Sequence, residues 1–143
     1  MCTQAMVETE VALVNDASLV GLRVLVVEDD DELRRAIREV FLMRGFAVNT
    51  ARDGSSAVEL AQQERYDVVV SDIRLPGLDG IGVARRLTGM KEAPRVVLMT
   101  AYPEWKVYEE AREAGALRVI KKPVGLGHLA SLVEELASSR EQG

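Results

Sequence analysis

The chain has 143 residues, of which 48% are hydrophobic and 29% are charged, with a formal net charge of −5. This length and composition are typical of one globular domain and exclude a disordered or fibrous chain. No apolar run approaches the ~20 residues that cross a bilayer, the first residues lack the basic flank and long apolar core of a signal peptide, and the single cysteine excludes a disulfide framework. The missing apolar span and signal-peptide features lead us to expect a cytoplasmic protein that does not bind membranes. Because the basic residues form no stripe, we also expect no direct binding to nucleic acid.

Residues 1–20 precede the first regular pattern. They carry apolar residues at weak periodicity among acids and small polar residues, which is compatible with either a short helix or a mobile arm. We expect this segment to be an N-terminal extension. The main domain is predicted at 21–139, with 140–143 as a tail.

From Gly21 onward, short apolar runs alternate with segments whose apolar residues recur at helical spacing. The runs are apolar on both faces and too short for helices, so they predict buried parallel strands at 24–27, 46–48, 68–70, 96–99 and 117–120. The intervening stripes predict five helices, around Leu33–Phe41, Ala57–Ala61, Ile81–Leu87, Val107–Ala114 and Leu129–Leu136. This alternation is typical of βαβ units, whose right-handed crossovers build a doubly wound α/β sandwich of three layers.

Polar residues follow four of the predicted strands at their carboxyl ends. In doubly wound sheets, ligands bind outside this edge. Each residue alone is typical of a helix cap, a turn or a solvated charge, but their joint placement on one rim indicates a site. The residues are Glu28, Asp29 and Asp30 after the first strand, Asp72 after the third, Thr100 after the fourth, and Lys121 and Lys122 after the fifth.

Carboxylates that meet on one rim repel one another unless a cation joins them. Hard oxygen ligands with no histidine or cysteine nearby favour Mg²⁺ or a similar ion. An ammonium and a hydroxyl group add the charge neutralisation and hydrogen bonding that phosphoryl transfer requires. Asp72 is the best candidate acceptor, because it follows an apolar strand and precedes the fixed turn at 75–77.

Four segments resemble, in their order and spacing, the motifs of bacterial response-regulator receiver domains: VLVVEDD (24–30), VVVSDIRLPGLDG (68–80), VVLMTA (96–101) and KKP (121–123). The similarity covers residues 22–138. It implies the flavodoxin-like strand order 2-1-3-4-5. It also implies a phospho-accepting switch of a two-component system, phosphorylated by a sensor histidine kinase or a phosphotransfer protein and read by a downstream target protein or output domain.

The resemblance also implies residue roles. Asp72 matches the phospho-acceptor, and Mg²⁺ would be held by Asp29, Asp72, the backbone carbonyl of Arg74, and Glu28 either directly or through water. Thr100 matches the switch hydroxyl. Lys122 takes the family's lysine position because it stands directly before proline, which implies a cis Lys122–Pro123 bond.

Some positions depart from the family pattern or modify it. Receivers often carry an aromatic residue three positions before the lysine, and Val119 stands there with a stiff side chain that cannot make the same swing. Trp105 and Tyr108 lie off the core stripe of the fourth helix, where partner contact and partly buried packing are equally compatible readings. Arg74 and Tyr102, two residues after the acceptor and the threonine, are predicted to slow hydrolysis by excluding water.

Three function classes remain open. The favoured one is a phospho-accepting receiver that works through partners and is not a turnover enzyme. A second copy of the chain, in a homodimer, is one such partner. An aspartyl-phosphate phosphatase would require a second acidic residue two positions after its nucleophile. Arg74 occupies that position, which disfavours this class. A receiver-shaped module that is never phosphorylated would be expected to have lost some of the five residues that match the family's site. All five are present, namely Glu28, Asp29, Asp72, Thr100 and Lys122.

Overall fold

The structure is a computed structural model that describes the backbone of residues 21–142 and the side chains of residues 21–138. The predicted extension at residues 1–20 lies outside the described residues. The last helix continues to Gln142, past the domain boundary predicted at residue 139. This continuation has a simple cause, since residues 130–142 contain neither glycine nor proline.

Strands and helices alternate strictly through residues 21–142. The strands are parallel and lie in the order β3-β2-β4-β5-β6, which is the 2-1-3-4-5 order of a flavodoxin-like sheet and confirms the predicted fold. The strands are β2 (Arg23–Val27), β3 (Ala47–Ala51), β4 (Val68–Asp72), β5 (Arg95–Thr100) and β6 (Arg118–Lys121). The helices are α1 (Asp31–Met43), α2 (Gly54–Gln63), α3 (Gly80–Thr88), α4 (Trp105–Glu113) and α5 (Leu126–Gln142).

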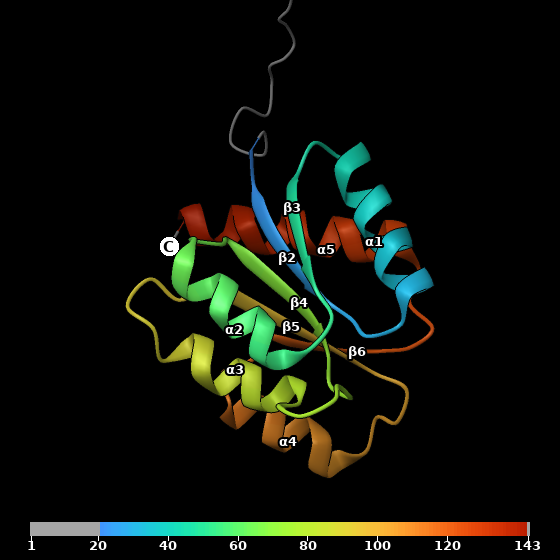
Figure 1. Ribbon diagram of the computed structural model, residues 1–143, viewed down its shortest axis with the longest axis vertical. Helices are drawn as coiled ribbons and strands as arrows, with labels where there is room; N and C mark the ends of the chain where they lie inside the picture. The colour runs from blue at the N-terminus through green and yellow to red at the C-terminus, as the bar shows by residue number, and fades with distance from the viewer. Residues whose placement is uncertain (1–20, 143) are drawn as a thin grey trace, which may run out of the picture.

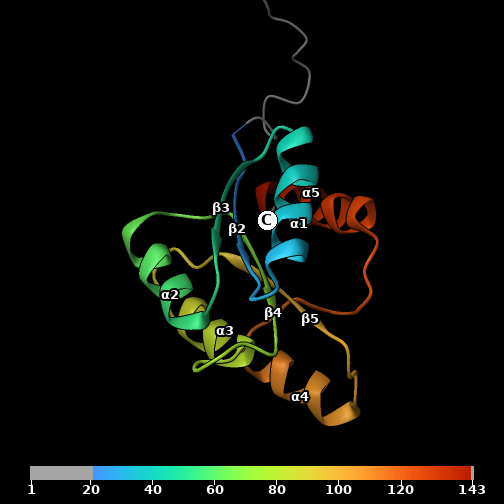
Figure 2. The ribbon, with the colours of Figure 1, turned by 45° about the vertical axis from the view of Figure 1, so that its right-hand side comes forward.

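Helices cover both faces of the sheet. Figures 1 and 2 show α1 and α5 together on one face, and α2, α3 and α4 on the other. Alternate residues of β2 supply the two cores: Val24 and Val26 pack with α1 and α5, whereas Leu25 and Val27 pack with the other three helices. The period-2 alternation of a strand thus explains why the central strands are apolar on both faces.

The prediction that all five strands are buried is wrong for the two edges. β2 and β4 lie at the centre and are almost wholly buried, whereas β3 and β6 are mostly half-buried or exposed. Each edge strand has a neighbour on one side only and receives less helix cover. In β6, accordingly, Arg118 and Lys121 are exposed at the two ends of the strand.

The parallel register brings the carboxyl ends of the strands to one edge, and a capping residue starts α1 directly after β2. Asp72 pairs with Met99, and Thr100 pairs with Lys121 on the next strand. Asp30 begins α1 by accepting hydrogen bonds from the N–H groups of Glu32 and Leu33. Within the described residues, no helix is long and apolar enough to cross a membrane.

Candidate functional site

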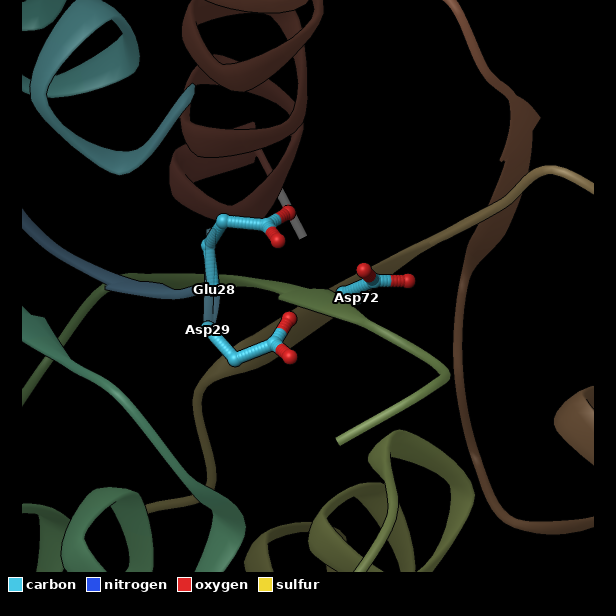
Figure 3. Close-up of side chains that lie close together, drawn as sticks. All are labelled: Glu28, Asp29 and Asp72. Carbon is cyan, nitrogen blue, oxygen red and sulfur yellow. The ribbon is translucent and has the colours of Figure 1, made fainter. Parts of the chain in front are cut away.

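Three carboxylates converge at the carboxyl edge of the sheet. Glu28 and Asp29 directly follow β2, and Asp72 ends the neighbouring strand β4. Each offers a carboxylate oxygen, and these oxygens all lie within 4.8 Å of one another. Figure 3 shows the side chains of Glu28 and Asp29 reaching from the β2 end toward Asp72. The strand ends that the sequence placed on one rim therefore do meet.

Glu28 is the most buried of the three acids, with 1% of the residue exposed. Its Oε2 accepts the N–H of Asp30 at 3.1 Å, and its Oε1 accepts Lys122 Nζ at 3.2 Å. Burial raises the pKa of Glu28 above its ordinary value, and the charge of Asp72 raises it further, against the opposing effects of the Asp30 N–H and Lys122. Both carboxylate oxygens of Glu28 are therefore engaged within the protein.

Lys122 is the cation of this cluster. Its Nζ lies 2.8 Å from Asp72 Oδ2 as well as 3.2 Å from Glu28 Oε1. Partial burial lowers its pKa, but the hydrogen bond and charge of Asp72, followed by those of Glu28, prevail and leave the pKa raised. Lys122 therefore remains charged at neutral pH. Lys121 is exposed and forms no ion pair with any described residue, and the Lys122–Pro123 bond is cis as the resemblance implied.

Asp72 is held by the loop that follows it. The residue is 6% exposed, and its Oδ1 accepts the N–H of Arg74 at 3.2 Å. The loop closes where Gly80 N–H donates to the Ile73 carbonyl at 2.8 Å. A Cβ at Gly80 would clash with the backbone carbonyl oxygen of Asp72, so α3 can begin this close to the acceptor only with glycine there.

Thr100 and the two predicted modulators form the other wall. Thr100 is buried at the end of β5, and its Oγ1 accepts the N–H of Tyr102 at 3.0 Å. The Arg74 guanidinium lies over the ring of Tyr102, with Cζ 4.7 Å from the ring centroid. Both side chains are exposed, yet they contact each other and so join the loop after β4 to the loop after β5.

Hard oxygens make up the donor set of this pocket. Three carboxylates with one ammonium beside them match what Mg²⁺ binds in proteins, namely a few carboxylates with water or phosphate completing the shell. No histidine or cysteine joins the cluster among the described residues. The residues present therefore fit Mg²⁺.

A shallow groove lies away from the acids, between α4 and β6. Trp105, Tyr108 and Val119 line it, and its volume is about 330 Å³. Trp105 is 75% exposed, and Tyr108 is also exposed. Of the two readings of these aromatic residues, the structure therefore favours a surface position over packing in the core.

Arg34 was not predicted from the sequence as a residue of the site, and the structure places it beside the acidic pocket. It lies on α1 and donates to the backbone carbonyl of Glu28 at 2.9 Å and to the Asp31 carboxylate at 2.6 Å. Its i,i+3 spacing from Asp31 indicates the ion pair. No sequence signal indicates the bond to the Glu28 carbonyl, because that bond depends on how α1 sits against the end of β2.

The family model described as the response regulator receiver domain matches residues 24–134. The chain belongs to this family. The receiver is 34% identical over 113 residues to sporulation initiation phosphotransferase F of Bacillus subtilis, an alignment that covers 79% of this chain and 91% of that protein. It is 37% identical over 119 residues to the transcriptional regulatory protein PdtaR of Mycobacterium tuberculosis, covering 82% of this chain and 57% of that one. The receiver thus spans nearly all of the first relative and little more than half of the second.

Solved structures agree with this assignment. The receiver domain of the Francisella response regulator 1452 is 28% identical, with a TM-score of 0.78 over 84% of this chain and 99% of that one. The receiver domain of the sensor histidine kinase PA1611 from Pseudomonas aeruginosa is 26% identical, with a TM-score of 0.76 over 83% and 99%. That second structure holds a magnesium ion coordinated in the active site cleft.

Proposed function

We propose that this receiver accepts a phosphoryl group on Asp72 from the phosphohistidine of a sensor kinase or phosphotransfer protein. The observation that carries the proposal is the position of Lys122, whose ammonium contacts the carboxylates of both Asp72 and Glu28 in one acidic pocket. The Asp72 carboxylate oxygen forms the new O–P bond while the N–P bond of the donor breaks. The electron pair of that bond returns to the imidazole nitrogen.

Mg²⁺ is the proposed cofactor. Asp29, Asp72 and the backbone carbonyl of Arg74 would hold it, together with Glu28 either directly or through water. When bound, the ion neutralises negative charge on the oxygens of the group being transferred. The cleft magnesium of the PA1611 receiver supports this assignment, as does the hard-oxygen donor set of the present pocket.

Lys122 and Thr100 are proposed to bind the transferred group. Lys122 already neutralises the carboxylate that reacts, and its raised pKa keeps the charge in place. The Thr100 hydroxyl accepts one hydrogen bond from Tyr102 N–H, which leaves its own proton available to donate to a phosphoryl oxygen. Donation would draw Thr100 toward Asp72 and alter the loop that leads into α4.

The surface of α4 is the proposed readout. Trp105 and Tyr108 offer exposed aromatic area at the groove, which a downstream target, an output domain or a second copy would cover. Val119 fills the place of the swinging aromatic residue and packs against the core, so we propose that the signal runs through Thr100 and the loop after β5 instead. The protein acts through such partners in the cytoplasm and has no turnover reaction of its own.

Arg74 and Tyr102 are proposed to prolong the life of the aspartyl phosphate. Hydrolysis needs water in line with the scissile bond, and the stacked pair bridges the two loops that border Asp72. We expect Arg74→Asn with Tyr102→Glu to shorten the phosphoryl half-life several-fold at fixed Mg²⁺. Arg85→Asn is the control, because Arg85 is an exposed arginine on α3 and its replacement should leave the half-life unchanged. Parental decay in the double variant would refute water exclusion.

Incubation with a small phosphodonor and Mg²⁺ tests the function itself. Stoichiometric incorporation is the expected result. Rapid release of phosphate with no phosphoprotein accumulating at saturating donor would instead favour the aspartyl-phosphate phosphatase. Failure to incorporate any phosphoryl group, in folded protein with saturating Mg²⁺, would favour the binding module.

A further inference from the structure

Arg34 contacts the backbone of the acidic loop, residues 28–30 between β2 and α1, rather than any carboxylate of the pocket. Its side chain is only 13% exposed, and its two terminal nitrogens reach two different groups. Nη1 donates to the carbonyl oxygen of Glu28 at 2.9 Å, and Nη2 donates to Asp31 Oδ1 at 2.6 Å. The guanidinium therefore bridges the end of β2 and the first turn of α1, a geometry that needs the planar fork of arginine.

Asp29 lies between two restrained peptide groups. The peptide before it carries the Glu28 carbonyl, which Arg34 holds. The peptide after it carries the Asp30 N–H, which donates to Glu28 Oε2 at 3.1 Å. Within the part of the chain that the structure describes, no group donates to the Asp29 carboxylate itself. The position of the Cα–Cβ bond from which this carboxylate extends is therefore set by the backbone on its two sides.

We propose that Arg34 is a positioning residue for the metal site: by holding the Glu28 carbonyl, it aims the Asp29 carboxylate at the position of the ion. This inference rests on the proposed Mg²⁺ site. Mg²⁺ demands near-ideal octahedral geometry, whereas Ca²⁺ tolerates flexible shells of six to eight oxygens. A loosened Asp29 therefore weakens Mg²⁺ binding more than Ca²⁺ binding.

Charge and position predict opposite results when Arg34 is removed. As a cation beside a cation site, Arg34 repels the ion, so loss of its charge alone would tighten Mg²⁺ binding. Loss of its hydrogen bond to Glu28 would weaken it. The sign of the change in Kd therefore separates a positioning residue from a residue that only contributes charge.

Arg34→Met removes the guanidinium group and keeps a long, unbranched side chain at this position of α1. Arg52→Met is the matched control, because Arg52 also contacts Asp31, at 3.3 Å, but does not contact the Glu28 carbonyl and is 70% exposed. Arg34→Lys retains the charge without the fork and takes the place of Arg34→Met if that variant does not fold. Circular dichroism and urea unfolding establish that each variant is folded.

Amide chemical shifts of Asp29 and Asp30, followed by NMR during titration with MgCl₂ and then CaCl₂, give the Kd for each ion. We expect Arg34→Met to raise the Kd for Mg²⁺ about 10-fold, as outer contacts of metal sites commonly do, and the Kd for Ca²⁺ by clearly less. Arg52→Met should bind Mg²⁺ like the parent or more tightly.

Unchanged or tighter Mg²⁺ binding in folded Arg34→Met would overturn the positioning role, as would equal weakening for the two ions. A parent protein that fails to bind Mg²⁺ would overturn the proposed site as well, so the two failures are distinguishable.

Discussion

Two loops border the pocket, and the structure holds them very differently. The loop after β2 leads into α1, where Asp30 caps two N–H groups and Ile37 and Phe41 are fully buried. The loop after β5 leads into α4, where, among the described residues, Glu104 makes no side-chain capping bond and Ala111 is the one buried residue of the helix. The metal-binding side is thus firmly anchored, and the side proposed to respond is not.

This difference has a physical meaning. A metal site needs ligands that stay in place, because each displaced ligand weakens binding. A switch needs an element of low local stability, since elements that move are drawn from those with few buried contacts. The receiver therefore combines a fixed acidic loop with a weakly held helix, and Asp72 lies between them.

The largest expected effect comes from Asp72→Asn, which removes the acceptor and leaves both loops intact. The amide is nearly isosteric but cannot form the acyl phosphate, so labelling by a small phosphodonor should fall to background. Urea unfolding should still show a cooperative transition. Asp79→Asn is the control, because Asp79 caps α3 in the same region and asparagine caps equally well. Full labelling of Asp72→Asn would place the acceptor elsewhere.

Asp29→Asn acts on the anchored side alone. A direct carboxylate ligand is lost, so we expect Mg²⁺ affinity to fall by about 10-fold or more. Asp30→Asn removes the same charge one residue away and preserves the α1 cap, so its Mg²⁺ affinity should stay close to that of the parent. Equal losses in the two variants would mean that total charge, rather than ligand position, governs binding.

Lys122→Ala tests the cation that bridges Glu28, on the anchored side, and Asp72. It leaves Glu28 and Asp72 close together without their counter-charge, at a cost of roughly 1–3 kcal/mol of unfolding free energy, less than for a fully buried pair because Lys122 is 21% exposed. Added Mg²⁺ should reduce this deficit by pairing with the same carboxylates. Lys121→Ala should change stability by less than about 0.5 kcal/mol. Equal phosphorylation defects in the two variants would show that both lysines reach the phosphoryl group.

Glu104→Ser gives the smallest effect and addresses the weakly held side. Serine at this position can accept an N–H bond at the start of α4, which should add about 0.5–1 kcal/mol to stability. Amide hydrogen exchange should slow in α4 and stay unchanged in α1. Glu104→Ala is the control without a cap. If α4 amides of the parent already exchange as slowly as those of α1, the contrast between the two loops is wrong.

Much of this architecture could be predicted from the sequence, for identifiable reasons. Val24–Val27 and Val68–Val70 are apolar on both faces because central strands are covered on both sides. In a parallel sheet their carboxyl ends share an edge, and the strand order implied by the resemblance makes these two strands neighbours, so Glu28, Asp29 and Asp72 were predicted to meet. Strand placement and strand order together determined this part of the site.

Other features depend on distances that no local pattern encodes. The bond from Arg34 to the Glu28 carbonyl requires a particular placement of α1 against β2. The stacking of Arg74 on Tyr102 depends on two loops from different strands. The partial exposure of β3 and β6 follows from their edge positions, which the apolar run of each strand does not reveal by itself.

Locating the phosphoryl group tests the central claim most directly. The parent protein is incubated with a small phosphodonor and Mg²⁺, digested at low temperature, and mapped by tandem mass spectrometry. We expect one phosphoryl group per chain, on the peptide that contains Asp72, and none when Mg²⁺ is chelated. A phosphoryl group found on the single histidine, His128, on a serine or on any other acid, with Asp72 unmodified, would contradict the account.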